Sequence, residues 1–311
     1  MRVLPSNRLH SVNADDFRAK LLEASVLVDA GSPGLYHRSA DYESVVRALE
    51  PYVREAGRDD NPTRLFFAPV INLETLKGSG YVGSFPNLIG TIDSFDGDMK
   101  KLGEFRERVD SGGEWFELMS HTDVALCSAA CHSVYPMYKG ATLPNEGLYF
   151  EVQANCFRHE PSMDPARLQS FRMHEFVYLG NPDGALAFRD RWIAKGQQLL
   201  GDLGLVLDLV PANDPFFGRG AQLMAQGQLE KELKFEVTAT ISSDAPGAIS
   251  SGNYHEDHFG ITFSMSTPDG EVAHSACFAF GFDRITLALY YTHGLRLEEW
   301  PEEVRERLAL S

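Results

Sequence analysis

The 311-residue sequence predicts an α+β fold in which a mostly antiparallel sheet is flanked by helices. Stretches that alternate apolar and polar residues indicate strands, and helical patterns lie between and around them. We see neither an internal repeat nor a low-complexity tract in this order. We therefore expect a single domain over residues 1–311, which is long enough to bury a substantial core.

Composition limits the functions open to the chain. The net charge of −16, from 28 basic and 44 acidic residues, disfavours a non-specific nucleic-acid binder. No apolar run approaches the roughly 20 residues of a membrane span, and the start, MRVLPSNRLHSVNADDF, lacks a secretory signal. The four cysteines do not suggest a disulfide framework in a chain of this length. We expect a cytoplasmic protein whose thiols are buried, bind a metal, or both.

The first part of the chain predicts helices and one short strand. Residues 15–28 indicate a helix, and residues 41–55 carry apolar side chains at helical spacing. The segment LFFAPVI, 65–71, indicates a strand, and the charged residues 97–112 indicate a helix or an exposed segment. Each of these elements lies before the main run of strands.

A glycine-rich segment, GSGYVGSFPNLIG, occupies residues 78–90. Gly78, Gly80 and Gly83 have the G-x-G-x-x-G spacing of dinucleotide-binding loops, which requires a helix to begin there. Pro86 follows instead, and no helical periodicity begins. We expect a loop that leads into a strand.

The second part of the chain alternates helix and strand patterns. In order they are a helix at 184–204, a short helical insertion near 213–230, a strand at 233–241, a loop rich in Ser, Gly and Asn at 242–258, and a segment at 274–294 that changes from strand to helix near Gly281. Gly294 ends that helix, and Pro301 opens a short final one.

The centre of the chain predicts a hairpin with unusual charges. Residues 148–157 alternate as a strand, Pro161 and Pro165 break the pattern, and residues 171–180 resume it. Glu175 lies on the same face as apolar residues of the returning strand. A buried carboxylate needs a partner, because an unpaired buried charge is strongly disfavoured.

Two arginines at the ends of strands indicate anion binding. Arg158 follows the first strand of the hairpin in F-R-H-E, and Arg284 lies in the first turn of a helix in G-F-D-R. A guanidinium binds phosphate or carboxylate through two parallel hydrogen bonds. The alternative is a plain ion pair with a neighbouring Asp or Glu.

These segments resemble a known family. F-R-H-E with its proline loop and G-F-D-R resemble motifs 2 and 3 of the class II aminoacyl-tRNA synthetases, and GYVGSFPNLIG resembles the region around motif 1. Five segments resemble the amino acid:[carrier protein] ligases, which are truncated relatives of the zinc-dependent seryl-tRNA synthetases of methanogens: GLYHRSADYESVV, AACHSVYPMY, CFRHEPSMDPARLQSFRMHEFV, SGNYHEDHFGITF and HSACFAFGFDRITLAL. The resemblance covers roughly residues 30–295. It implies the class II catalytic fold and a homodimer formed through Phe85–Pro86.

The resemblance also implies a zinc ion. The matching ligands are Cys131, Glu175 and Cys277, and three protein ligands leave an open position, which this family uses for the α-amino group. Cys127 and Cys156 are expected to be buried, inert thiols. The segment HEDH, 255–258, lacks the spacing of a helical metal-binding pair.

We expect Asn253, two residues before that segment, and His255, its first residue, to frame the substrate or ATP.

The implied reaction is the ATP-dependent activation of glycine or alanine to an aminoacyl-adenylate, with Mg2+ accompanying ATP. The aminoacyl group then passes to the phosphopantetheine thiol of a carrier protein. The catalytic arginines are Arg158, which would hold the α-phosphate, and Arg284, which would hold the γ-phosphate. Arg167 would reach the β- and γ-phosphates, Phe171 would stack on adenine, and Glu160 would contact the adenine side or organise the first arginine.

Two other functions stay open at this stage. A true synthetase acting on tRNA is disfavoured because 311 residues leave little room for a tRNA-binding appendage and the charge of −16 opposes tRNA. A catalytically silent, synthetase-like binding protein is disfavoured because the motif arginines and metal ligands are present. We expect the carrier protein to dock on the helix near residues 218–229.

Overall fold

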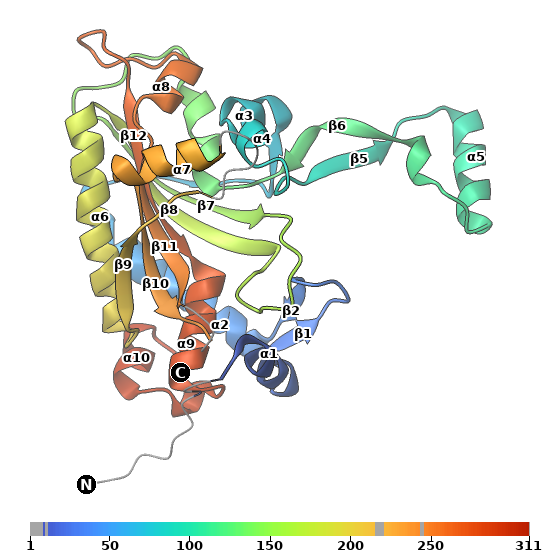
Figure 1. Cartoon of the computed structure of the whole chain (residues 1–311), viewed down its shortest axis with the longest axis horizontal. Helices are drawn as coiled ribbons and strands as arrows, with labels where there is room; N and C mark the ends of the chain where they lie inside the picture. The colour runs from blue at the N-terminus through green and yellow to red at the C-terminus, as the bar shows by residue number, and fades with distance from the viewer. Residues whose placement is uncertain (1–8, 10–11, 215–220, 243–245, 311) are drawn as a thin grey trace.

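A computed structural model describes residues 9, 12–214, 221–242 and 246–310. Its main sheet has seven strands in the order β3-β7-β8-β12-β11-β10-β9, and every neighbouring pair is antiparallel except β3 with β7. The strands are β3 (Thr63–Phe66), β7 (Leu148–Phe157), β8 (Ser170–Gly180), β9 (Leu207–Pro211), β10 (Lys234–Thr240), β11 (Pro246–Tyr254) and β12 (His274–Gly281). The expected mostly antiparallel sheet with flanking helices is confirmed (Figure 1).

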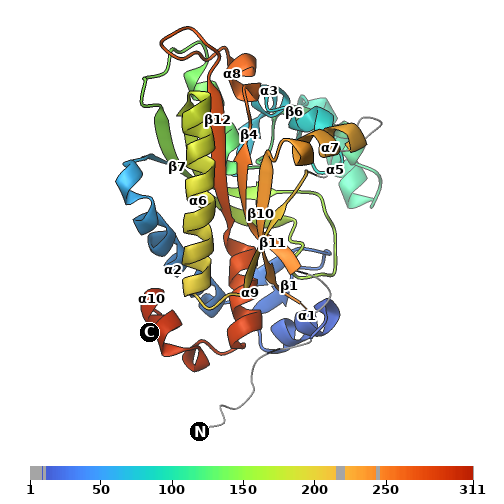
Figure 2. The same ribbon diagram turned by 60° about the vertical axis from the view of Figure 1, so that its left-hand side comes forward.

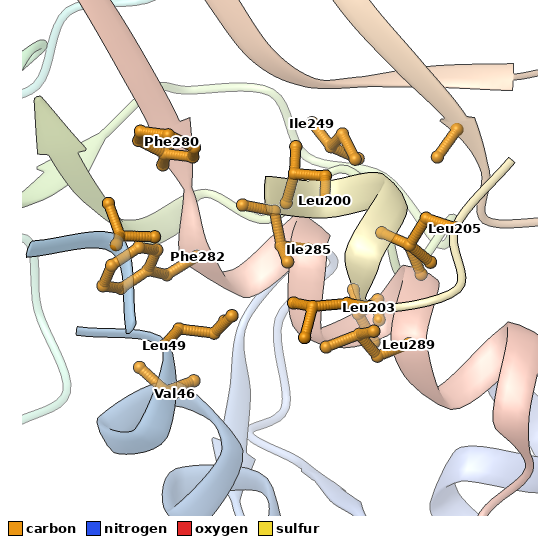
Figure 3. Packing of buried hydrophobic residues seen from close by; sticks show 14 of the residues in the cluster. Val46, Leu49, Leu200, Leu203, Leu205, Ile249, Phe280, Phe282, Ile285 and Leu289 are labelled. Carbon is orange, nitrogen blue, oxygen red and sulfur yellow. The ribbon is translucent and has the colours of Figure 1, made fainter. Parts of the chain in front are cut away.

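Three helices cover one face of this sheet: α2 (Ala40–Ala56), α6 (Pro182–Asp202) and α9 (Phe282–His293). Figure 2 shows α6 running along β12, and Figure 3 shows apolar side chains of all three helices meeting in the core. A Cβ on Gly196 of α6 would lie 2.3 Å from the ring of Phe278. The absence of a side chain at this position therefore lets the helix pack closely against the sheet.

Several predicted elements are confirmed. Helix α2 matches the pattern at 41–55, and β7 and β8 form the predicted hairpin. The chain changes from β12 to α9 at Gly281, and Gly294, with φ of 100°, follows the end of that helix. The last helix, α10 (Glu302–Arg307), begins after Pro301.

Two predicted elements near the start are wrong in their extent. Helix α1 (Ala14–Glu23) ends before residue 28, because Ser25 takes a left-handed φ of 56° and the chain turns into β1 (Leu27–Asp29), which pairs with β2 (Tyr36–Arg38). The predicted strand at 65–71 is two strands in different sheets. Pro69 lies between β3 and β4 (Val70–Asn72), where its missing N–H ends the pairing.

Two predicted loops also differ from the structure. The glycine-rich segment contains the end of α3 (Leu73–Gly78) and the short α4 (Tyr81–Ser84) before it leads into a strand. The loop predicted at 242–258 is largely strand β11. Its small residues suggested a loop, but they have a packing reason, since a Cβ on Gly252 would lie 2.7 Å from Ile193 of α6.

A long arm projects from the body of the molecule (Figure 1). It consists of β5 (Thr91–Phe95), α5 (Met99–Asp110) and β6 (Met119–Leu126), and β6 pairs with β4 at its base. The charged segment 97–112, which was expected to be helical or exposed, is both, since it contains α5 and none of the residues of α5 is buried.

The remaining helices are α7 (Ala221–Glu230) and α8 (His258–Phe263). Helix α7 falls within the insertion expected near 213–230, of which residues 215–220 lie outside the described chain. Over the residues that the structure describes, no helix is both long enough and apolar enough to span a bilayer.

Candidate active site

A cleft of about 950 Å³ lies on the face of the main sheet opposite α6. Alternation along β8 produces this arrangement, because Phe176 packs in the core under α6 whereas Glu175 faces the cleft. Helices α4, α7 and α8 contribute walls through Tyr81, Gln228 and Phe259. The sheet is therefore the floor of the cleft, and short helices surround it.

Cys131, Glu175 and Cys277 form a buried Cys–Glu–Cys cluster in this cleft. One donor atom from each residue lies within 4.8 Å of the others, and the side chains are at most 4% exposed. The cluster joins three elements: a 3₁₀ helix (Ala130–Ser133), β8 and β12. The N–H of Ala130 donates to Glu175 Oε1 at 2.8 Å and fixes the carboxylate.

The charges of this cluster favour a bound cation. Burial, followed by the nearby Cys277, raises the pKa of Glu175 to about 7. A hydrogen bond with Cys131 holds the pKa of Cys277 well below the usual range, and the pKa of Cys131 is raised well above it by the same contact. Three acidic groups this close repel one another when ionised. Two thiolates and one carboxylate are a donor set that suits zinc, so the residues fit the predicted metal.

Two buried arginines lie in the same cleft. Arg158 has a buried Nε without a hydrogen-bond partner among the described residues, and its Nη2 reaches Ser128 O only at 3.5 Å. Arg284 is held by the carbonyls of Ala166 at 2.8 Å and Ala248 at 3.0 Å. Burial lowers the pKa of Arg284, and the charge of Arg158 lowers it further. These arginines have no carboxylate partner of their own within ion-pair distance among the described residues, which favours the anion-binding interpretation over a plain ion pair.

The other predicted nucleotide contacts line the cleft as well. The guanidinium of Arg158 lies 5.4 Å from the centre of the Phe171 ring. Glu160 and the exposed Arg167 face each other at 3.9 Å across the loop that joins β7 to β8. The structure therefore brings together in one cleft all five residues that were predicted to contact ATP: Arg158, Glu160, Arg167, Phe171 and Arg284.

Asn253 and His255 lie beside the metal cluster. Asn253 Nδ2 is 3.5 Å and His255 Nε2 is 3.6 Å from Cys277 Sγ. Both residues also line the cleft. The sequence did not indicate that these two residues contact the sulfur of Cys277, one of the expected metal ligands.

Further polar residues of the cleft were missed by sequence reasoning. His132 lines the cleft, and Ser128 behind it lies with its Oγ 3.0 Å from His132 Nδ1. Burial lowers the pKa of His132 to about 3, so its ring is neutral at physiological pH. Lys234 donates to Asp214 at 2.5 Å, and both residues line the cleft. The only sequence signal for them was the charge of Lys234 on a strand.

A buried network behind the cleft connects the two motifs. Asp283 precedes Arg284, and its carboxylate accepts the backbone N–H of Arg172 at 2.6 Å and that residue's Nη2 at 2.6 Å. Arg38 Nε lies 3.0 Å and Tyr42 Oη 3.1 Å from the same carboxylate. This network fixes the start of α9 against β8.

Comparison with curated proteins finds relatives along most of the chain. No family model matches the chain. Amino acid–[acyl-carrier-protein] ligases 2 and 1 of Bradyrhizobium diazoefficiens are each 44% identical to it over 285 residues. These matches cover 91% and 90% of this chain and 85% and 86% of the two ligases. Type-2 serine–tRNA ligase of Methanopyrus kandleri is 24% identical over 266 residues, and the chain spans 50% of its length.

Solved structures show the same fold. Seryl-tRNA synthetase of M. kandleri, in complex with A. aeolicus tRNASec, superimposes with a TM-score of 0.81 at 18% identity, over 96% of this chain and 61% of that one. Seryl-tRNA synthetase from Pyrococcus horikoshii, complexed with ATP, gives 0.69 at 12% identity, over 94% of this chain and 63% of that one. The class II synthetase catalytic fold is thereby confirmed. With 44% identity over nine-tenths of its length, the chain belongs to the amino acid–[acyl-carrier-protein] ligase family.

Proposed function

We propose that the protein uses ATP to activate a small amino acid, glycine or alanine, and transfers it to the phosphopantetheine thiol of a carrier protein. One observation carries the proposal: a single cleft contains both a pair of buried arginines and the Cys–Glu–Cys cluster. The arginines suit the phosphates of ATP, and the cluster suits a metal that binds an amino group. The names of the relatives supply the substrate classes.

In the first step, a carboxylate oxygen of the amino acid attacks the α-phosphorus of ATP. The new P–O bond gives the aminoacyl-adenylate, and the bond to pyrophosphate breaks; Mg2+ enters with ATP. Arg158, whose Nε is free to donate, holds the α-phosphate, and Arg284, anchored by two carbonyls, holds the γ-phosphate. Arg167, 56% exposed on the loop, reaches the β- and γ-phosphates. Catalysis by these residues is positioning and charge neutralisation.

The base and the amino group are held by different parts of β8 and its loop. Phe171 offers a ring face to adenine, and Glu160, 3.9 Å from Arg167, contacts the adenine side or organises Arg158. Bound zinc would present an open coordination position to the α-amino group, and so select α-amino acids over plain carboxylic acids. Glu175 would be one of the three metal ligands, and the N–H of Ala130 fixes its carboxylate in position.

In the second step, the carrier thiol attacks the carbonyl carbon of the adenylate, a thioester forms and AMP leaves. No cysteine of the protein has to be acylated. Cys127 and Cys156 are both buried, as expected, and pack in the apolar cluster under the cleft. Helix α7 is our candidate docking site for the carrier, because its Gln228 and Lys231, the residue that follows the helix, line the cleft. Residues 218–220 of that segment lie outside the described chain.

The proposal is tested by pyrophosphate exchange with zinc-loaded protein and a panel of amino acids. We expect exchange with glycine or alanine and little with larger side chains. Activated amino acid is then offered to a phosphopantetheinylated carrier protein and, separately, to tRNA. Exchange with no amino acid would overturn the adenylation step. Labelling of tRNA rather than of the carrier would support a true synthetase instead.

We also propose a homodimer, in which the projecting arm contacts the second copy. Phe116 on the arm is 65% exposed and Met99 is 78% exposed, so the arm presents two large apolar side chains at its surface. The two residues expected at the dimer interface have different surroundings, since Phe85 lines the cleft whereas Pro86 is exposed at the surface. The arm therefore offers more apolar surface for a partner than that segment does.

A further inference from the structure

We infer that Asn253 and His255 are positioning residues for the metal ligand Cys277: each donates an N–H group to its sulfur, and the hydroxyl of Ser275 selects the donor tautomer of His255. This inference rests on the proposed metal site and extends it to residues that do not bind the metal. It also changes the role of both residues, which the sequence suggested only as a frame for substrate or ATP.

The strand pairing brings both donors to the sulfur. Asn253 on β11 is the direct cross-strand partner of Cys277 on β12, and its Nδ2 lies 3.5 Å from Sγ. His255 follows the end of β11, and its Nε2 lies 3.6 Å from the same sulfur. Side chains that face each other across an antiparallel pair lie on one face of the sheet, so this meeting follows from the register.

The chemistry of the sulfur determines the direction of these hydrogen bonds. A thiolate bound to a metal can only accept, so His255 Nε2 must carry a hydrogen. A neutral imidazole has one N–H, which leaves Nδ1 as an acceptor. Ser275 Oγ lies 2.9 Å from that Nδ1 and donates to it. The amide nitrogen of Asn253 likewise uses its second hydrogen on Ser251 Oγ at 3.2 Å.

The ring of His255 is held where this arrangement needs it. Its backbone N–H donates to the carbonyl of Ser275 at 2.9 Å, which sets the distance between the two side chains. The ring meets Phe259 edge-on with a centroid distance of 5.1 Å, and Phe259 in turn stacks on Tyr135 at 3.6 Å. Ser275 is only 1% exposed. A chain of buried contacts therefore aims Nε2 at the sulfur.

The consequence concerns how the thiolate serves the metal. Two N–H donors draw electron density from Cys277, so a bound metal receives less charge from this sulfur and is a better acceptor for an amine. The donors also fix the sulfur in place before the metal arrives. Positioning is the larger effect on affinity, because removing outer contacts of this kind lowers metal affinity by about 10- to 100-fold.

The experiment titrates metal-free protein with Co2+, whose thiolate charge-transfer band reports on the sulfur directly, and measures zinc affinity by chelator competition. His255→Gln can place an amide N–H near the former Nε2, whereas the similar His255→Asn places one near Nδ1. We expect His255→Asn to weaken zinc binding about tenfold or more and to move the band to longer wavelength, and His255→Gln to retain most of the wild-type behaviour. The matched control is His258→Ala, because His258 also packs on Phe259 but bonds Ser79 O; its band should not move.

The outcomes separate this inference from the metal site itself. Wild-type protein that binds no cobalt through thiolates would overturn the metal site, and this inference with it. If wild type binds cobalt but His255→Asn leaves both the band and the zinc affinity unchanged, the inference alone is wrong. Equal loss in the Gln and Asn variants would show a merely structural role. Ser275→Ala should shift the band in the same direction as His255→Asn, by a smaller amount.

Discussion

Replacing Asp283 by Asn should destabilise the protein strongly and weaken ATP binding. The carboxylate is 0% exposed and is shared by Arg38, Arg172 and Tyr42. Asn has nearly the same shape but no charge, so the substitution removes the counter-ion of Arg38 and one of the two counter-ions of Arg172, which keeps Glu43. Breaking a buried ion pair on one side costs about 3–5 kcal/mol. Because Asp283 precedes Arg284 in the chain, we also expect a raised KM for ATP.

The assay is urea unfolding followed by circular dichroism, with Glu43→Gln as the matched control. Glu43 binds the same Arg172 at 2.7 Å, but its side chain is 29% exposed. An ion pair that water can reach contributes only about 0.2–1 kcal/mol. Each variant thus removes one carboxylate partner of Arg172, a buried one in Asp283→Asn and a partly exposed one in Glu43→Gln. A loss below about 1 kcal/mol for Asp283→Asn, or equal losses for both variants, would refute the reasoning.

The dependence on pH gives a second check. Burial alone would raise the pKa of Asp283, but the hydrogen bonds from Arg172 outweigh burial and hold it below the usual 3.8. A carboxyl group with a lowered folded pKa stabilises the fold fully above its unfolded pKa, and this contribution is lost as pH falls through the folded value. The difference in unfolding free energy between wild type and Asp283→Asn should therefore be constant from neutral pH to about pH 5 and narrow only in stronger acid.

Four further predictions concern the cleft and the arm. Glu175→Gln should bind zinc at least tenfold more weakly, measured by chelator competition, because a neutral amide replaces a charged ligand; unchanged affinity would exclude Glu175 as a ligand. Arg158→Ala should reduce pyrophosphate exchange by at least about 100-fold and Arg158→Lys should restore it only in part, since lysine cannot form two parallel bonds; full activity in the alanine variant would contradict the phosphate role. Chelation of zinc should lower the melting temperature, because the metal would join three separate elements, and an unchanged temperature would argue against it. Replacing residues 96–118 by Asn-Gly, between the paired Phe95 and Met119, should convert a dimer to a monomer in sedimentation; a dimer that persists would place the interface elsewhere.

Local pattern was enough to predict much of the fold. The two-residue alternation of β7 and β8 and the helical spacing in α2 depend only on near neighbours in sequence, and all three elements are confirmed. The same alternation placed Glu175 on the cleft face. The metal set itself came from resemblance, since nothing in local sequence brings Cys131 next to Cys277.

The parts that sequence reasoning missed depend on contacts between distant segments. Strand β11 was predicted as a loop because serine and glycine usually mark loops. In the structure, Gly252 meets α6, and the other face of the strand needs small residues to leave the cleft open. The contacts of Asn253 and His255 with Cys277 were missed for the same reason. They depend on β11 being a strand, which pairs Asn253 with Cys277 and places His255 just beyond it. The pattern of a single strand does not contain such information.

The hairpin of β7 and β8 explains why one sheet can hold both halves of the reaction. Cys156 pairs with Phe171, and Val152 pairs with Glu175, so the ring expected to hold adenine and the metal ligand lie four residues apart on one strand. At about 3.3 Å per residue, this separates them by about 13 Å. A shift of one residue in the pairing would turn Glu175 toward α6 and leave the two cysteines without their carboxylate. In the proposed reaction, the length of β8 between Phe171 and Glu175, rather than a loop, would therefore set the distance between the nucleotide and the amino group.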